Sequence, residues 1–192
     1  MTFSFFINSI LFGVGLAMDA FSISLANGLA EPHMPKKRMS MIAGVYGFFQ
    51  TAMPLLGWIC VRTIAEIFTA FQKFIPWIAL LLLLYIGGKM LADGIKNRDG
   101  KVEAPAVGIG ALMVQAVATS IDALSVGFTI TDYNFPMALV ASLIIGLVTY
   151  GICLVGLKIG KTAGTGLAGK ASIIGGIILI IIGIEIFLKG IL

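Results

Sequence analysis

Charged residues are scarce in this sequence, and that scarcity sets the first limit on its fold. They make up 11% of the 192 residues, whereas about a quarter of the residues in soluble domains are charged. Hydrophobic residues reach 59%, more than one soluble core of this chain length can enclose. The composition therefore predicts an all-α integral membrane protein, with one membrane domain over residues 1–192 and the lipid bilayer as its surroundings. The few cations form no clustered basic face, so we expect no nucleic-acid partner.

Cysteine and histidine are also rare, and this excludes several kinds of site. Cys60 and Cys153 both lie inside apolar runs, where their spacing suits neither a disulfide framework nor a metal-binding knuckle. His33 is the one histidine; it falls in a short link and is predicted to be a solvated loop residue. Metal ions that favour thiolate and imidazole ligands therefore lack their usual partners in this chain.

A signal peptide and a complete nucleotide-binding motif are missing as well. Met1 to Phe3 carry no basic residue, and the first apolar run is too long for a signal core, so we interpret it as a membrane span. Gly164 to Ala171 fits a phosphate-binding loop, except that Ala171 replaces the Ser or Thr that binds Mg²⁺, and no strand precedes it. We expect a flexible link there and no cofactor, so any process that needs energy in this chain would have to draw it from an ion gradient.

Six apolar runs reach the length of about 20 residues that a helix needs to cross a bilayer. The links between these runs are short and hold most of the charged residues. We therefore predict six transmembrane helices near Phe3–Leu29, Met39–Val61, Phe74–Ile95, Val107–Ile130, Phe135–Leu157 and Ala171–Leu188.

The distribution of lysine and arginine predicts the orientation, because these residues concentrate in cytoplasmic links. The first, third and fifth links hold nine of them, beginning with Lys36. The second link and the C-terminal tail hold three, which are Arg62, Lys73 and Lys189. We therefore expect the odd-numbered links to lie in the cytoplasm and both termini to lie outside.

The two halves of the chain repeat one another. Asp19 aligns with Asp122, and Gly47 and Gly57 align with Gly146 and Gly156 at one constant offset. A third match, again at one offset, joins Ile86-Gly87 and Gly94-Ile95 to Ile182-Gly183 and Gly190-Ile191. Three helices per half is an odd number, so we predict two inverted three-helix repeats, at about residues 1–98 and 104–192. The many glycines suit close helix packing, either within the fold or between the subunits of a homo-oligomer.

Each repeat carries an aspartate near the middle of its first helix, followed by a hydroxyl one turn later. Asp19 with Ser22, and Asp122 with Ser125, are i, i+3 pairs on one helix face. A charged Asp at the centre of a membrane helix costs roughly 2.5–3.5 kcal/mol, and such residues normally line a functional path. The two acids are predicted to be staggered along the membrane normal, where they either flank one ion or form two stations. The alternative is a pair of protonated, hydrogen-bonded structural acids.

Further oxygen ligands are predicted at the same depth. Pro54 leaves the carbonyl of Gln50 without its helical donor, so this backbone oxygen and the Gln50 amide are both available, unless a neighbouring helix heals an ordinary kink. Thr119 lies one turn before Asp122 and adds a hydroxyl. Oxygen ligands suit Mg²⁺, Ca²⁺ and Mn²⁺, and two carboxylates balance the charge of one divalent ion. The residues alone thus predict a transporter for a hard divalent cation.

Lys89 and Glu185 occupy equivalent positions of the two halves, yet the predicted topology places them toward opposite faces of the membrane. Lys89 is expected to extend its ammonium group to the membrane surface. The role of Glu185 stays open between an outer exit and an interfacial position.

Four segments together resemble the manganese efflux pump (MntP) family of bacteria, which is related to the broader lysine-exporter group. The segments are Met18-Asp19-Ala20-Phe21, Gln50 to Trp58 (QTAMPLLGW), Ile86 to Met90 and Ala118 to Ala123. The resemblance covers nearly the whole chain and implies a non-enzymatic exporter of Mn²⁺ in the bacterial cell membrane. It also implies that Asp19 and Asp122 are the functional acids, whereas it assigns nothing to Glu185.

We expect alternating access between the halves, with Mn²⁺ as the transported substrate. The expected ligands are Asp19, Asp122, Gln50, Ser22, Ser125 and Thr119. Protons from outside are expected to compete for the acids, because burial disfavours a charged carboxylate. Two alternatives stay open. A passive divalent-cation channel would carry the ion only down its gradient, and a membrane-embedded enzyme would use the two aspartates as a catalytic pair.

Overall fold

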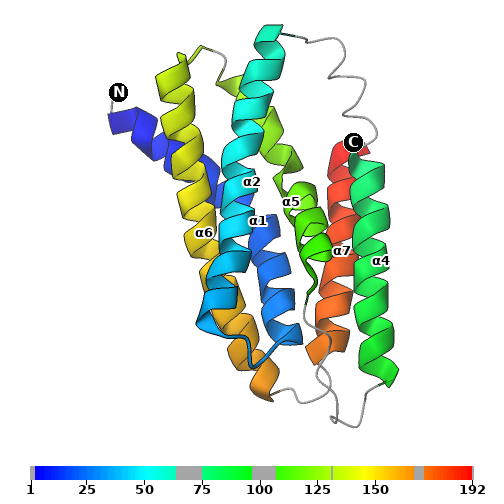
Figure 1. Cartoon of the computed structure of the whole chain (residues 1–192). Coiled ribbons are helices and arrows are strands. Elements are labelled where there is room, and N and C mark those ends of the chain that lie inside the picture. The colour runs from blue at the N-terminus through cyan, green and yellow to red at the C-terminus, as the bar shows by residue number, and fades with distance from the viewer. Residues whose placement is uncertain (1–2, 64–74, 97–106, 131, 167–170, 192) are drawn as a thin grey trace.

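In the computed structural model, residues 3–63, 75–96, 107–130, 132–166 and 171–191 are described, and their regular structure is entirely helical (Figure 1). The helices are α1 (Phe3–Ala30), α2 (Lys36–Thr63), α4 (Ile75–Lys96), α5 (Ile109–Thr129), α6 (Phe135–Gly166) and α7 (Ala171–Ile191). The predicted links at 64–74, 97–106 and 167–170, and Lys73 with them, lie outside the described residues.

The six predicted membrane helices are confirmed as helices, and all but one of their ends lie within three residues of the predicted ends. Among the described residues, α1, α2, α5 and α6 are long and apolar enough to cross a membrane by length and composition. Large apolar side chains such as Leu11, Phe48 and Leu147 are exposed on the outside of these helices. Lipid is the solvent that suits such a surface, and the chain is a multi-pass membrane protein.

α1 packs along α6, and the two helices run in the same direction (Figure 1). Gly13 lies against Val148, and fifteen residues later on α1 Gly28 lies against Gly160 of α6. Residue numbers therefore rise together along the contact, as they do only between parallel helices. The absence of a side chain on the glycines lets the two backbones touch, which is a common way to pack membrane helices.

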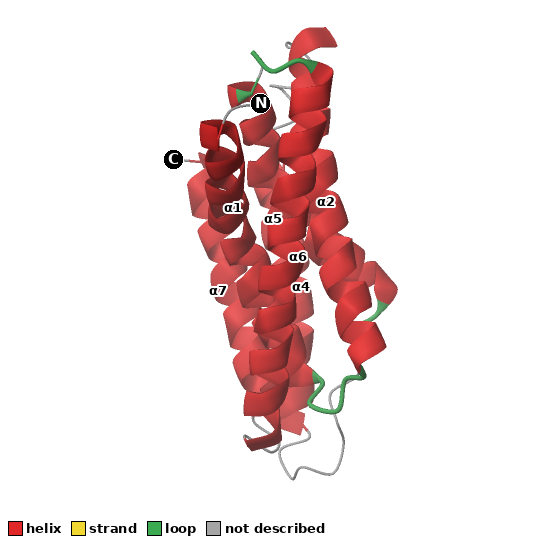
Figure 2. Ribbon diagram, turned by 90° about the vertical axis from the view of Figure 1, so that its left-hand side faces the viewer, coloured by secondary structure: helices red, strands yellow, loops and turns green. Residues whose placement is uncertain are grey.

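α2 packs along α5 in the same parallel manner. Tyr46 contacts Gln115 near the start of this pair, and Gly57 contacts Leu124 and Gly127 near its end. The loop at Glu31–Pro35 reverses the chain between α1 and α2, so the pair α2/α5 runs opposite to the pair α1/α6. α1 and α5, the two helices that carry the aspartates, are therefore antiparallel. Figure 2 shows these long helices side by side in one bundle.

α4 and α7 form a third pair, and they are antiparallel. Gly87 lies against Gly176, whereas Trp77 near the start of α4 stacks edge-to-face with Phe187 near the end of α7. Lys89 and Glu185 consequently lie toward opposite ends of the pair, as predicted from their topology, and both are exposed.

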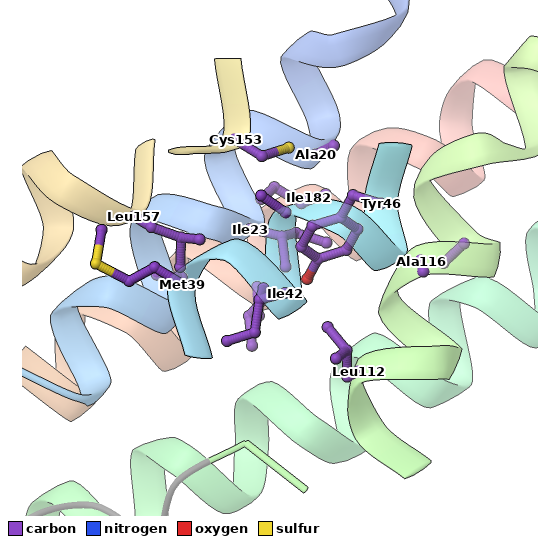
Figure 3. Packing of buried hydrophobic residues seen from close by; sticks show 14 of the residues in the cluster. Ala20, Ile23, Met39, Ile42, Tyr46, Leu112, Ala116, Cys153, Leu157 and Ile182 are labelled. Atoms are coloured by element: carbon purple, nitrogen blue, oxygen red, sulfur yellow. The ribbon is translucent and has the colours of Figure 1, made fainter. Parts of the chain in front are cut away.

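All six helices contribute side chains to one central core. Figure 3 shows part of it, where Ile23 of α1, Tyr46 of α2, Ala116 of α5 and Ile182 of α7 converge. Cys153 of α6 lies in this core as a free thiol, which confirms its predicted role as a small apolar residue. A smaller apolar cluster around Trp58 joins α2, α5 and α6 at the far end from the α1–α2 loop.

The predicted end of the fifth membrane helix was wrong, because α6 continues past Leu157 to Gly166. Gly156, Gly160 and Gly164 recur at every fourth position of α6 and all face the α1 backbone or the loop after it. A Cβ on Gly164 would lie 2.8 Å from the carbonyl oxygen of Leu29. The first residues of the predicted flexible link therefore form the last turn of a packed helix. The glycines there allow the helix to approach its neighbour closely and do not make the chain flexible.

Candidate metal site between the central helices

The two aspartates differ in exposure. Asp19 is half-buried on α1, and Asp122 is exposed on α5, where its Oδ1 accepts a hydrogen bond from the backbone N–H of Ala123 at 2.9 Å. Exposure in the bare chain does not by itself separate a lipid-facing acid from one that lines a path. The burial of the neighbouring turns describes the surroundings of each acid.

On α5, Asp122 continues the face that is buried in the first half of the helix. Gln115, Ala118, Asp122, Ser125 and Thr129 form one stripe at helical spacing. Gln115 and Ala118 are buried, and the stripe becomes exposed from Asp122 onward. The outward face of the same first half is a different stripe, formed by Ile109, Met113 and Val117. Asp122 thus lies in line with a face that is buried in the first half of α5 and exposed in the second half.

On α1, Asp19 lies where a similar stripe changes from exposed to buried. Phe12 and Gly15 on this side of the helix are exposed, whereas Ala26 and Ala30 are buried. Because α1 and α5 are antiparallel, both stripes are buried toward the α1–α2 loop and exposed toward the opposite end of the bundle. Each acid therefore lies near the point along its helix where burial at the loop end gives way to exposure.

Gln50 of α2 joins the two acid-bearing helices directly. Its Nε2 donates to the carbonyl oxygen of Leu16 on α1 at 3.0 Å and to that of Thr119 on α5 at 3.1 Å. Both partners are carbonyls, so the nitrogen must face them, and this fixes which end of the amide is the oxygen. That oxygen, Oε1, is fully buried and has no hydrogen-bond partner among the described residues.

The Gln50 bridge also relates the heights of the two acids. Leu16 and Thr119 each lie three residues before their aspartate. Since the two helices are antiparallel, Asp19 lies on the loop side of the Gln50 amide and Asp122 on the other side, each within one helical turn. This is the order expected of the predicted stagger.

The predicted hydroxyl ligands occupy the same turns. Ser22 is half-buried and donates to the carbonyl of Met18 at 3.0 Å, and buried Thr119 donates to the carbonyl of Gln115 at 2.9 Å. Donation to the preceding turn leaves the lone pairs of each oxygen free to accept a hydrogen bond or bind a cation. Ser125 is exposed, one turn beyond Asp122.

Three buried polar residues that sequence reasoning missed lie on the loop side of both acids. Asn27 of α1 donates to the hydroxyl of Tyr46 of α2 at 3.0 Å and to Oε1 of Gln115 of α5 at 2.9 Å. The Tyr46 hydroxyl also donates to Gln115 Oε1 at 2.9 Å, so the three side chains close a ring. Each is 0% exposed. The signal available in the sequence was Gln115, an amide within the apolar first turns of α5.

Charged side chains tie the helices together at the loop end. Arg38 at the start of α2 pairs with Glu31 of the loop at 2.8 Å and donates to the carbonyl oxygen of Val107, just before α5, at 2.7 Å. Lys161 of α6 donates to the carbonyl oxygen of Met34 at 2.7 Å. His33 lies in this loop and is exposed, as predicted.

The available donors are oxygens from carboxylates, an amide and hydroxyls. No group of three or more His, Cys, Asp or Glu side chains lies together in the part of the chain that the structure describes. A site formed by Asp19 and Asp122 would thus need neutral oxygens to complete its ligands, and Gln50 Oε1 is a buried oxygen that lacks a partner. Such a donor set suits hard divalent ions and not zinc or copper.

The amino-acid sequence of this chain matches a known protein family over most of its length. Residues 33–187 match the family model described as "Putative manganese efflux pump" (Mntp). The chain belongs to this family. Curated relatives carry the name "Putative manganese efflux pump MntP": one from Clostridium botulinum (strain Loch Maree / Type A3) is 40% identical over 95% of this chain and 94% of that protein.

Further members of the MntP family confirm the extent of the match. A relative with the same name from Methanosphaera stadtmanae is 38% identical over 93% of this chain and 97% of that protein, and one from Clostridium perfringens (strain SM101 / Type A) is 36% identical over 94% and 92%. The resemblance stated from four segments is therefore correct. No solved structure matches the chain. The family is one of transporters and not of enzymes.

Proposed function

We propose that this chain exports Mn²⁺ from the cytoplasm by alternating access, with Asp19 and Asp122 as the charged ligands. The observation that carries the proposal is the Gln50 bridge. One side chain joins the two acid-bearing helices at matched positions, and its oxygen, Oε1, is buried without a hydrogen-bond partner among the described residues. The hydroxyls of Ser22, Ser125 and Thr119 complete the proposed ligands. Mn²⁺ itself is inferred from the names of the relatives, because oxygen ligands alone do not separate it from Mg²⁺ or Ca²⁺.

We propose further that the halves are inverted repeats, and their contacts support this. Gly57 packs against Leu124 and Gly127 of α5, whereas Gly156, its predicted equivalent, packs against Phe21 and Ser24 of α1. Adding the offset between Asp19 and Asp122, which is 103, to 21 and 24 gives 124 and 127. Equivalent glycines thus touch equivalent residues.

The contact between Gly47 and Gly146 supports the same symmetry. These two residues are predicted equivalents, and they lie against each other, since a Cβ on Gly47 would be 2.8 Å from the carbonyl oxygen of Gly146. Self-equivalent contacts of this kind lie on a two-fold axis. An axis through the α2–α6 crossing, within the membrane, is the arrangement found in transporters with inverted repeats.

The parallel pairs define the bodies that would move. α1 packs chiefly on α6, whereas α2 packs on α5 and equally on α6, which it crosses. The parallel pairs α1/α6 and α2/α5 each combine one helix from each half of the chain. We propose that α1/α6 and α2/α5 shift against each other about the α2–α6 crossing. The halves do not rock as separate units, because each half contributes to both pairs. The α1–α2 loop faces the cytoplasm of a bacterial cell, and both termini lie outside, on the lysine and arginine distribution.

The decisive experiment is active transport by the purified protein in proteoliposomes. We expect Mn²⁺ to accumulate above its outside concentration when an ion gradient is imposed, because alternating access couples the two fluxes. A passive channel would stop at equal concentrations, and that result would replace the proposal by the channel alternative. Absence of any Mn²⁺ flux would remove both.

Proton coupling is a separate prediction. Reversing an imposed pH gradient is expected to reverse the direction of net Mn²⁺ accumulation. The reason is that protons bind the empty carboxylates on one side and cross the membrane through the same site, in exchange for Mn²⁺. The measurement is Mn²⁺ content of proteoliposomes with equal metal on both sides. Accumulation that responds to a Na⁺ gradient and ignores the pH gradient would contradict proton coupling while leaving export intact.

Replacing Gln50 by leucine tests the bridge. Gln50→Leu removes both cross-helix hydrogen bonds and Oε1, and the half-saturating Mn²⁺ concentration is expected to rise about 10- to 100-fold, as when a residue that supports a metal site is lost. Thr51→Val is the matched control, since the Thr51 hydroxyl bonds only the Gly47 carbonyl of its own helix. A fall in maximal rate with unchanged half-saturation would contradict a role in binding.

A further inference from the structure

The ring of Asn27, Tyr46 and Gln115 joins helices that belong to different moving pairs. Asn27 lies on α1, in the pair α1/α6, whereas Tyr46 and Gln115 lie on α2 and α5. The two hydrogen bonds that Asn27 donates therefore cross the boundary at which the pairs would shift, whereas the bond from Tyr46 to Gln115 lies within the pair α2/α5. A purely local structural network would have no need to lie on that boundary.

The ring is placed on one side of the proposed metal site. Along the sequence, Asn27 lies eight residues after Asp19, Gln115 seven before Asp122 and Tyr46 four before Gln50. Given the directions of α1, α2 and α5, all three separations point toward the α1–α2 loop. The ring thus lies between the acids and the loop end, on the stripe of α5 that leads to Asp122.

Burial is complete at this level and incomplete beyond it. The three ring side chains are 0% exposed, whereas Asp19 on the α1 stripe is half-buried and Asp122 on the α5 stripe is exposed. One other bond that crosses between the pairs lies at the same end, between the hydroxyls of Ser40 of α2 and Tyr150 of α6 at 2.8 Å. Lys161 of α6 also bonds the Met34 carbonyl of the loop that joins α1 to α2. Every donor and acceptor atom that takes part in these hydrogen bonds has its partner within the ring. These atoms therefore need no water molecule as a partner.

We infer that Asn27, Tyr46 and Gln115 form the gate on the loop side of the metal path, and that the structure describes the state in which this gate is closed. The inference rests on the proposed alternating access. Opening the path from the loop end requires the bonds of Asn27 to Tyr46 and Gln115 to break as the pairs separate. The gate residues are neutral, so they hold the closed state by hydrogen bonds and repel no cation.

Thiol labelling tests the gate without relying on transport. The reporter is Ala118→Cys, a position between Gln115 and Asp122 that is 4% exposed, in a background that carries Cys60→Ala and Cys153→Ala. A membrane-impermeant maleimide is applied to sealed vesicles of each orientation. His33→Cys, in the exposed loop, identifies the vesicles whose outer surface is the loop side.

Labelling of the reporter from the loop side is expected to be slow in the otherwise unchanged protein. It is expected to rise about tenfold with Gln115→Ala, since loss of the cross-helix hydrogen bonds shifts the population toward the open state. Tyr46→Phe keeps the bond between Asn27 and Gln115, so a smaller rise is expected, and this variant decides the question if Gln115→Ala does not accumulate. The control is Ser120→Ala, because Ser120 is equally buried on α5 but donates only to Ala116 and Val117 of its own helix.

Unchanged labelling in Gln115→Ala and Tyr46→Phe would overturn the gate, as would an equal rise in Ser120→Ala, which would indicate general loosening of α5. Mn²⁺ transport is measured on the same vesicles. Transport with unchanged labelling rejects the gate and leaves the proposed function standing. Altered labelling without any Mn²⁺ transport in the parent protein rejects the proposed function and leaves a gate for another cargo.

Discussion

Cells that produce Asp19→Asn or Asp122→Asn are expected to retain Mn²⁺ and to grow as poorly in excess Mn²⁺ as cells without the protein. Asparagine keeps the size of the side chain and one oxygen, but it removes the charge that balances a divalent ion. Residues that merely support a metal ligand change affinity 10- to 100-fold, so loss of a charged ligand should reduce export by at least about 100-fold. The measurement is cellular manganese content after a metal load.

The matched control is Asp132→Asn, which alters an exposed acid in the short segment between α5 and α6. This variant is expected to export Mn²⁺ at the unaltered rate, and all three variants should reach the same level in the membrane. Export by Asp19→Asn at the unaltered rate would exclude Asp19 as a ligand. Normal export in both single variants would return the two acids to the structural, hydrogen-bonded alternative.

The second large effect is expected for Gly160→Leu, which should prevent the protein from accumulating in the membrane. A Cβ at this position meets the Leu25 carbonyl and lies 2.9 Å from the nitrogen of Leu29 and 3.0 Å from the Cα of Gly28. All three are backbone atoms of α1, which cannot turn aside as a side chain would. Even the single methyl of Gly160→Ala should cost about 1–3 kcal/mol, as overpacking of a close contact usually does.

Gly151→Leu provides the comparison on the same helix. Gly151 is exposed, and a Cβ there meets nothing within 4 Å, so this variant is expected to accumulate normally. The readouts are the amount of protein in the membrane fraction and the midpoint of thermal unfolding in detergent. Equal losses in the two variants would show that α6 tolerates no side chain on either face and that the contact with α1 is not the cause.

The helices could be predicted closely from the sequence because each is set by local composition. An apolar run of spanning length, bounded by prolines and charges, determines where a helix begins and ends, and this holds for α1, α4 and α7. The end of α6 could not be predicted in this way. Its last turns contain Lys158 and Lys161 and several glycines, which look like a loop until the contact with α1 is known.

The two acids of the candidate site could be identified from the sequence. A charged Asp is costly in a membrane, and Asp19 and Asp122 occur in the same local sequence pattern. Gln50 was also singled out, for its backbone carbonyl and its side-chain amide together. In the structure its side-chain nitrogen donates to carbonyl oxygens of two other helices. That role depends on two carbonyls from other helices, which no local pattern specifies.

The pairing of the helices could not be predicted from the sequence. Aligning the halves identifies equivalent residues such as Gly57 and Gly156, yet it does not say which helix each one touches. The ring of Asn27, Tyr46 and Gln115 was missed for the same reason. Its three members lie on three helices and share no spacing, so their proximity follows only from the parallel packing of α2 on α5 and from the position of α1 beside both helices.

The crossed pairing has a consequence for how the protein is made. α1 finds its principal neighbour in α6 and makes few contacts with α2, the next helix to be synthesised. The first two helices must therefore wait in the lipid, largely unpacked, until α5 and α6 emerge from the ribosome. During that interval Asn27 lacks Gln115, its partner on α5, so an insertion factor that shelters polar helices is expected to matter most for the first half of the chain.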